Sequence, residues 1–496
     1  MALFIVIFAV SGIILNHRSL FSGIDVNRNY LPQEFKYKNW NNAAVKSACN
    51  LSPDSILVYG NIGVWLTDSL FSEFKDFNKG FKSGADNRKV FKVLKTESGN
   101  LYAGTLFGLF QYNFKDQIWQ VIEIPVHDVR VVDLLELDGE VFVLTRSYLL
   151  TSLDRQGNLN FEKKTFPPPT NYDNKVGLFK TLWVIHSGEI AGFAGKLFVD
   201  LLGFVVIFLT ITGFIYWLFP KWIKRRKRKQ KTREVLKSVN RFSLKWHNKI
   251  GIWVVAFLIV SSITGMFLRP PLLIAIAYSK VGKIPFTVLD SPNPWYDKLR
   301  RILYDEASQE FIIGTNDGIY RIDKSLQKLL KPMIGQPPLS VMGINVFEQK
   351  ENGNILVGSF NGLYLWNPLN GSSYNYINPK KQVIVDRSGP PLSENMTAGY
   401  IRLGNDEIIF DYNRGAETGR SDYVFPEMPI EIIETSPMSL WNVALEFHTT
   451  RFYKFIVGDF YILLIPLFGL TVLIVLITGI FLWLKIHKRK LKAKRS

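Results

Sequence analysis

The stretch His186-Ser-Gly-Glu-Ile-Ala-Gly-Phe-Ala-Gly-Lys196 leads into an uncharged span, Leu201–Phe219, and a long basic run begins at Lys221. The same order of features recurs near the C-terminus, where His448-Thr-Thr-Arg-Phe452 precedes a second apolar span and a second basic run. A histidine therefore leads into a long apolar span twice in this chain. We take this repeated arrangement as the main indication of fold and function.

Three spans lack charged residues over about the length that a helix needs to cross a bilayer, roughly 20 residues. They are Leu201–Phe219, Ile250–Leu268 and Phe460–Leu484. A fourth apolar run, Ala2–Leu15, would cover only about 20 Å as a helix, against a bilayer core of about 30 Å. We predict a membrane protein with a four-helix transmembrane bundle whose first helix is short.

The four spans form two copies of one unit, helix, external domain, helix. Val10–Leu15 in the first span aligns with Ile263–Leu268 in the third, and Thr-Gly pairs end the second and fourth spans at Gly213 and Gly479. The third span opens further upstream with Lys245-Trp-His247-Asn-Lys-Ile-Gly251, and the first span's counterpart of this opening would lie before Met1. We expect a native start upstream that adds a basic, histidine-containing turn. A stop codon directly before Met1 in the coding DNA would refute this expectation.

The positive charge is confined to two short segments. Residues 221–249 hold thirteen Lys or Arg against the single acid Glu234, and residues 485–495 hold seven and no acid, so these segments account for the whole net charge of +18. Basic segments beside apolar spans indicate the cytoplasmic side of a membrane. They favour attraction to anionic lipid headgroups and argue against a nucleic-acid partner. Cys49 is the only cysteine, which excludes an internal disulfide framework and multi-cysteine zinc sites.

The segments between the spans read as β-structure outside the membrane. A motif of strand, Gly, small residue, Gly and strand occurs at Gly99–Tyr112, Gln309–Ile322 and Gly353–Trp366, with weaker candidates at Ile56–Leu66, Leu134–Leu150 and Tyr400–Tyr412. Alternating aromatic and β-branched residues around a glycine turn are typical of hairpins. These stretches resemble the blade repeats of sensor-type β-propellers. We prefer one all-β propeller with three blades from each half of the chain; two separate small β domains are the alternative.

Four of the six histidines, His17, His186, His247 and His448, lie at span ends. Imidazole is the usual axial ligand of haem held between membrane helices, and a pair of histidines on facing helices can ligate one iron. His186 and His448 could share an external site, while His247 and a missing counterpart could form a cytoplasmic one. The alternative is that these histidines are interfacial anchors beside tryptophan.

Other residues near His186 suggest packing and ion pairs. Gly188, Gly192 and Gly195 recur on one side of the predicted His186 helix, where small residues would let backbones approach a flat macrocycle. The acidic residues at the membrane edge are explained by ion pairs alone. We expect Glu189 and Asp200 to pair with Lys196, and Asp459 to pair with Lys454.

In several features the chain resembles the PepSY-associated transmembrane family. These features are the four spans, the opening Lys245–Gly251, the Thr-Gly pairs, and the stretches that begin at His186 and His448. The resemblance covers about 120 residues in four pieces. It implies an inner-membrane reductase of ferric-siderophore complexes with one or two b-type haems, in which the family's histidines correspond to His186, His448 and His247. The absent first opening and the propeller-like external region depart from the family pattern. His17 is a further candidate ligand.

Two functions remain open from the sequence. The first is a transmembrane oxidoreductase of the ferric-reductase type, in the inner membrane of a bacterium, with cytoplasmic termini and a periplasmic domain. A quinol or a cytoplasmic donor would supply electrons to a ferric chelate or another periplasmic acceptor. The second is a non-enzymatic, membrane-anchored propeller that acts as a sensor or docking platform. The sequence contains no hydrolase, phosphate-loop or dinucleotide-binding motif.

The predicted boundaries follow from these assignments. They are 1–16 for the first span, 17–180 for the first external half, 181–220 for the second span, 221–245 for the basic loop, 246–269 for the third span, 270–440 for the second external half, 441–485 for the fourth span and 486–496 for the basic tail.

Overall fold

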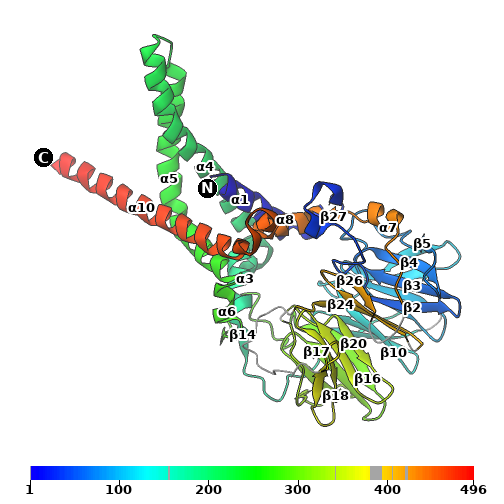
Figure 1. Ribbon diagram of the computed structural model, residues 1–496. Helices are drawn as coiled ribbons and strands as arrows, with labels where there is room; N and C mark the ends of the chain where they lie inside the picture. Colours follow the sequence, from blue (N-terminus) through cyan, green and yellow to red (C-terminus); the bar gives the residue numbers. More distant parts are fainter. Residues whose placement is uncertain are drawn as a thin grey trace. The chain divides into compact units, whose positions relative to one another are not determined.

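The computed structural model describes residues 2–154, 157–340, 342–379, 394–404, 406–418 and 423–495. The chain divides into two compact units (Figure 1). The helical unit comprises Met1–Phe21, Asn174–Ser291 and Leu440–Ser496, and the sheet unit comprises Ser22–Asp173 and Pro292–Ser439. Each unit is therefore assembled from segments that lie far apart in the sequence.

Among its described residues the helical unit contains three helices that are long and apolar enough to cross a membrane, within Glu189–Arg228, Glu234–Phe267 and Arg451–Ile486, and one shorter apolar helix. Its main helices are α1 (Ala2–Asn16), α3 (Leu178–Ser187), α4 (Gly192–Arg228), α5 (Glu234–Phe267), α8 (Leu440–His448) and α10 (Tyr461–Arg495). The minor elements are α2 (Arg18–Phe21), α6 (Leu272–Ile276), α9 (Lys454–Val457), and the paired strands β14 (Lys175–Gly177) and β15 (Lys280–Gly282). Helices α4 and α5 lie side by side (Figure 1).

His186 lies on a separate short helix, which corrects the prediction of one continuous helix from His186 through the span. Helix α3 ends at Ser187 because Gly188 takes a left-handed conformation with φ of +78°, and Gly192 has φ of +64°. A Cβ on Gly188 would lie 2.1 Å from the carbonyl oxygen of Gly195. These glycines therefore allow a tight turn between two helices and do not form a stripe along one helix face.

The two copies of the repeated unit pack in equivalent ways. Gly203 of α4 lies against Ile13 of α1, and Gly469 of α10 lies against Met266 of α5. Gly203 aligns with Gly469, and Ile13 aligns with Met266. The internal repeat seen in the sequence is therefore present in the helix contacts as well.

In its described residues the sheet unit contains six antiparallel sheets of three or four strands, each paired in chain order. The first three sheets are β2–β5 (Ser47–Ser52, Ser55–Gly60, Gly63–Asp68, Phe74–Asp76), β6–β9 (Val90–Lys95, Leu101–Thr105, Gly108–Asn113, Ile118–Ile122) and β10–β13 (Val131–Leu137, Glu140–Thr145, Leu149–Leu153, Glu162–Lys164). The other three are β16–β19 (Leu299–Asp305, Glu310–Thr315, Ile319–Asp323, Lys331–Pro332), β20–β23 (Val346–Gln349, Ile355–Ser359, Gly362–Trp366, Ser373–Asn375) and β24–β26 (Thr397–Leu403, Asp406–Asp411, Gly415–Thr418). The unit also holds α7 (Ile430–Thr435) and the pair β1 (Asp25–Val26) and β27 (Met438–Ser439).

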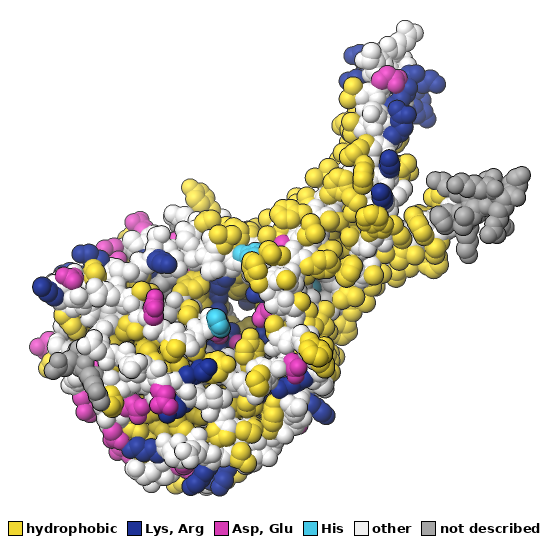
Figure 2. All heavy atoms as spheres, turned by 180° about the vertical axis from the view of Figure 1, so that it is seen from behind, with side chains coloured by type: hydrophobic (Ala, Val, Ile, Leu, Met, Phe, Trp, Pro, Cys, Tyr) yellow, Lys and Arg dark blue, Asp and Glu magenta, His cyan; other side chains and the backbone are white. Residues whose placement is uncertain are grey.

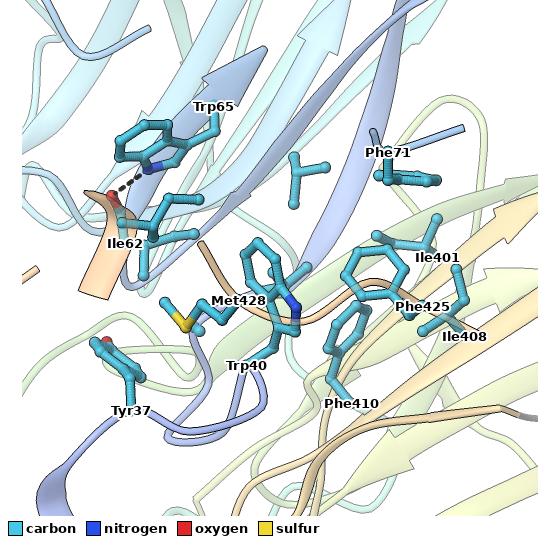
Figure 3. Packing of buried hydrophobic residues seen from close by; sticks show 14 of the residues in the cluster. Tyr37, Trp40, Ile62, Trp65, Phe71, Ile401, Ile408, Phe410, Phe425 and Met428 are labelled. Atoms are coloured by element: carbon cyan, nitrogen blue, oxygen red, sulfur yellow. Dashed lines mark hydrogen bonds between the residues drawn. The ribbon is translucent and has the colours of Figure 1, made fainter. Parts of the chain in front are cut away.

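The first strands of the six sheets contact one another in a closed ring, in the order β2, β6, β10, β16, β20, β24 and back to β2. The closure joins the two halves of the chain through a buried apolar cluster (Figure 3). In this cluster Trp40 and Trp65 come from the first half, and Phe410, Phe425 and Met428 come from the second. Both external halves therefore build one compact unit, and two separate β domains are not observed.

Glycine turns connect the second and third strands, as the repeated motif predicts. The turn glycines Gly108, Gly318 and Gly362 have φ of +143°, +147° and +120°, values that other residues rarely adopt. A hydroxyl two or three residues earlier supports the same turn, for example Thr105 Oγ1, which donates to Gly108 O at 2.9 Å. The six motif stretches fall on six different sheets.

Candidate functional site

Three histidines of the helical unit contact a neighbouring helix in the same way. His448 Nδ1 lies 3.0 Å from Ser11 Oγ on α1, and His186 Nδ1 lies 3.3 Å from Thr264 Oγ1 on α5. His247 Nδ1 lies 3.1 Å from Thr212 Oγ1 on α4. A glycine follows the hydroxyl residue each time, at positions 12, 265 and 213. In the sequence these Ser/Thr-Gly pairs only mark span ends; in the structure each hydroxyl also lies within hydrogen-bond distance of an imidazole.

The hydrogen bonds determine which ring nitrogen carries the proton. Ser11 Oγ donates to Ile7 O at 2.6 Å and Thr264 Oγ1 donates to Val260 O at 2.8 Å, so each hydroxyl accepts from the histidine. Backbone carbonyls accept from the same nitrogens, with Phe8 O 3.1 Å from His448 Nδ1 and Ser261 O 3.0 Å from His186 Nδ1. Because carbonyls only accept, Nδ1 is protonated and Nε2 keeps its lone pair in both rings. This is the tautomer that a metal-ligating histidine requires.

His186 and His448 lie next to each other, as the sequence predicts for a shared site. Their ring centroids are 6.1 Å apart and the ring planes make an angle of 57°. Metal–imidazole bonds are about 2 Å long and the ring centre lies about 1 Å beyond the nitrogen, so one iron between two histidines separates the ring centres by about 6 Å. The four-residue offset between the copies is absorbed by the turns that join α3 to α4 and α8 to α10.

The two imidazoles fit a metal ion whose other ligands come from a cofactor. In the part of the chain that the structure describes, no group of three or more His, Cys, Asp and Glu side chains could hold a bare metal ion. Two neutral imidazoles are the usual axial pair of a haem, whose macrocycle supplies the other nitrogens. The residues present therefore fit a haem better than an isolated ion.

The first testable consequence concerns Gly265. A Cβ at this position would lie 2.8 Å from His186 Cε1, so the ring must move in a Gly265→Ala variant. Alanine is otherwise preferred over glycine inside a helix, by about 1 kcal/mol. We expect the variant to fold but to bind haem at least about tenfold more weakly, which is typical of disturbing the groups that orient a metal ligand.

The matched control is Gly479→Ala. Gly479 is the glycine of the Thr-Gly pair on α10, and a Cβ there would meet no atom within 4 Å. Haem bound per protein, measured by absorption after titration, should fall only in the Gly265 variant. Equal haem contents in the two variants would contradict the positioning role of Gly265.

His247 has the same surroundings as the other two ligand candidates, but no second imidazole is found beside it within the described ranges. The fourth Ser/Thr-Gly pair is Thr478–Gly479, and its hydroxyl donates to Ile474 O at 2.8 Å. A second haem at His247 stays a prediction.

His17 takes part in a polar cluster. Its Nε2 lies 2.5 Å from Asp200 Oδ2, and Asn16 donates to Asp200 Oδ1 at 2.9 Å. Asp200 therefore pairs with α1 and not with Lys196 as predicted, since Lys196 lies 4.0 Å from Glu189. Lys454 and Asp459 form the expected ion pair at 3.5 Å. His17 as a substitute haem ligand stays a prediction.

The sheet unit contains a second charged cluster, at the third residue of four first strands. Lys92, Asp133, Arg301 and Glu348 occupy these positions in β6, β10, β16 and β20 and interact electrostatically. Arg301 Nη1 lies 3.6 Å from Asp133 Oδ1, and its guanidinium donates to the carbonyls of Ile344, Val132 and Asn345. Burial raises the pKa of Glu348. Arg301 thus ties together three neighbouring sheets.

Lys46, just before β2, provides a pH-dependent prediction. Burial and the positive charges of Arg301 and Lys89 lower the pKa of Lys46 to about 7. Between this pH and the ordinary lysine value the unfolded chain binds more protons than the folded chain, so stability rises with pH across that window. Lys46→Met should remove part of this rise and increase the melting temperature at pH 7 by roughly 2 to 4 °C.

The measurement is thermal unfolding in detergent at several pH values between 7 and 10, with the exposed Lys115→Met variant as control. If the melting temperature of Lys46→Met changes with pH in parallel with that of the wild type, the pKa of Lys46 is not lowered in the folded state.

Fold and site together define a membrane protein with an apolar helical unit, a histidine pair and a separate unit of antiparallel sheets. The family described as PepSY-associated TM region matches residues 1–219 and 221–320. This is more than half of the chain, and the protein belongs to this family, as the histidine and Thr-Gly pattern predicts.

No curated protein matches the sequence. Among solved structures, the extracellular domain of a one-component system from B. thetaiotaomicron is 11% identical with a TM-score of 0.37, covering 76% of this chain and 33% of that one. PorZ, a surface component of the type-IX secretion system of Porphyromonas gingivalis, is 12% identical with a TM-score of 0.34, covering 76% and 38%. The chain thus spans about a third of the length of these proteins, and at such TM-scores the likeness supports no assignment of fold or function.

Proposed function

We propose that this protein is a b-type haem protein of the bacterial inner membrane that passes electrons to a periplasmic acceptor, a ferric-siderophore or another ferric chelate. The observation that carries the proposal is the His186–His448 pair, with ring centroids 6.1 Å apart. Family membership adds support because the two histidines occupy equivalent places in the two copies of the repeat.

The chain's own residues hold and orient the ligands. Thr264 and Ser11 accept hydrogen bonds from the Nδ1–H groups, which directs the Nε2 lone pairs away from the helices that carry the hydroxyls. Both histidines are at least partly buried within the helical unit. A bound haem would supply the one-electron chemistry, with a potential that depends on ligand identity and burial.

The charge pattern supports the proposed orientation. Figure 2 shows Lys and Arg side chains gathered at one end of the α4–α5 arm, whose middle is mainly hydrophobic. Lys221, Lys224, Arg225, Arg228 and Lys229 line a hollow of about 510 Å³ there. Under the positive-inside rule this end is cytoplasmic, which puts the loop after α5 and the sheet unit on the periplasmic side. A membrane quinol or a cytoplasmic donor would then supply the electrons.

We propose a transmembrane bundle for the helices and a β-propeller for the sheets. The short α1 joins the three long helices as the fourth member of a transmembrane bundle, supported by its contacts with α4 and α8. The closed ring of first strands supports a six-bladed β-propeller, with three blades from each half of the chain. The ferric chelate would bind at the periplasmic side.

The test is the visible spectrum of protein purified in detergent from cells grown with ample haem. The proposal predicts a Soret band and α and β bands that sharpen when dithionite is added. It also predicts that a ferric chelate re-oxidises the reduced protein. A colourless preparation would eliminate the haem, and reduced haem that no ferric chelate re-oxidises would eliminate the proposed acceptor.

A further inference from the structure

Exposed apolar side chains follow one face of α4 from the uncharged span up to the first turn of the helix. Their exposed fractions lie between 48% and 68%, and the residues are Phe193, Leu197, Leu201 and Phe204. A spacing of three or four residues places them on the same side of the helix. The charged residues of this stretch are paired, since Asp200 is buried against His17 and Lys196 lies 4.0 Å from Glu189. The apolar face of α4 therefore continues beyond the uncharged span, to the beginning of the helix.

A loop of the helical unit lies beside this end of the apolar face. Residues 283–291 follow β15, and Val288 N donates to Ile190 O at 3.2 Å. Ile190 belongs to the short turn that leads into α4, three residues before Phe193. The loop is thereby held next to the first exposed apolar side chain of α4.

The loop presents an aromatic side chain outward. Phe286 is 102% exposed and Ile284 is 36% exposed, while Leu289 is 5% exposed and holds the loop to the unit. Phe286 has φ of +60°, a conformation that is unfavourable for a bulky residue. Hydrogen bonds fix it, because Thr287 Oγ1 donates to Ile284 O at 2.7 Å and Asp290 Oδ2 accepts from Phe286 N at 3.3 Å. The backbone is therefore fixed in a form that exposes Phe286.

The surroundings of the loop favour lipid as the partner of Phe286. The loop adjoins the apolar face of a helix that is long and apolar enough to cross a membrane, at the end opposite to the basic run. Lys280 and Lys283 precede the exposed apolar residues, and the only acid of the loop, Asp290, accepts the hydrogen bond from Phe286 N. Aromatic rings together with lysines are typical of segments that lie at the headgroup boundary of a bilayer.

We propose that the loop 283–291 is an interfacial anchor, which inserts Phe286 and Ile284 into the periplasmic leaflet of the bilayer at the headgroup boundary. The anchor attaches the turn between α3 and α4 to the lipid surface. Because Ile190 is only four residues beyond His186, the anchor also fixes the depth of the turn that follows this helix. The inference requires α4 to span the membrane, but it requires no bound haem.

Site-directed spin labelling tests the anchor, because Cys49 is the only cysteine and Cys49→Ser gives a cysteine-free background. Phe286→Cys carries the label, and Ile284→Cys is a second reporter on the loop. The controls are Phe204→Cys on the apolar face of α4 and Leu369→Cys, which is 81% exposed in the sheet unit. The full chain is reconstituted into vesicles of phosphatidylethanolamine and phosphatidylglycerol. Power saturation then measures how often each label collides with oxygen, which concentrates in the bilayer, and with a water-soluble nickel chelate.

We expect the two loop labels to collide more with oxygen than with the nickel chelate, as at Phe204, and the label at Leu369 to show the reverse. A label at position 286 that the chelate reaches as readily as at Leu369 would overturn the anchor. Low collision with both reagents, as expected if the sheet unit or a second copy covered the loop, would overturn it as well. A water-exposed label at Phe204 would instead refute the membrane span of α4. Thermal unfolding in detergent checks that each labelled variant is folded.

Discussion

Replacing His448 with alanine is expected to lower the haem content of the purified protein at least about tenfold, and His186→Ala is expected to do the same. Each variant removes one of two axial ligands, and even the groups that merely orient a metal ligand contribute 10- to 100-fold to affinity. Because the two rings face one site, the double variant should be no worse than either single one. Non-additivity of this kind is expected for residues that act together.

Haem per protein, obtained from the pyridine haemochrome spectrum, is the measurement for this series. His127→Ala is the control, since His127 is exposed and belongs to the sheet unit. Full haem occupancy in both single variants would show that the ligand assignment is wrong. Loss in only one of them would contradict a shared site.

The second large effect is expected in the sheet unit, from Arg301→Met. This change removes the guanidinium that pairs with the carboxylate of Asp133, which is 5% exposed, and it removes hydrogen bonds that link three sheets. Removing one partner of a buried ion pair costs about 3–5 kcal/mol. We expect the melting temperature of the unit to fall by roughly 10 °C.

A double variant separates the ion pair from the general packing. Replacing both partners of a buried pair by apolar residues is often neutral, so Arg301→Met with Asp133→Leu should recover part of the loss. The measurement is thermal unfolding followed by circular dichroism. A single variant as stable as the wild type would contradict the structural role of Arg301.

Much of the fold could be predicted because it follows from local patterns. Uncharged spans of membrane length predict the long helices, and each of the six stretches with a glycine motif lies on a different sheet. The pairing of His186 with His448 could be predicted because the repeat places them at equivalent positions. That comparison needs no distances, only an alignment of the chain with itself.

Other features depend on contacts that the sequence pattern does not contain. The break at Gly188 requires a positive φ, and a glycine beside a membrane span is equally compatible with helix packing. The pairing of His17 with Asp200 joins residues 183 positions apart. The Ser11 and Thr264 partners had a visible signal, since a hydroxyl residue precedes glycine in each copy, but nothing in that signal names the histidine as partner.

The central claim is that His186 and His448 together ligate one haem iron. Electron paramagnetic resonance of the oxidised, purified protein at low temperature tests it most directly, because the signal depends on the axial ligands. The account predicts a low-spin ferric signal with two nitrogen ligands in the wild type, which disappears or becomes high-spin in His186→Ala and in His448→Ala. A high-spin signal in the wild type, or a low-spin signal unchanged in both variants, would contradict it.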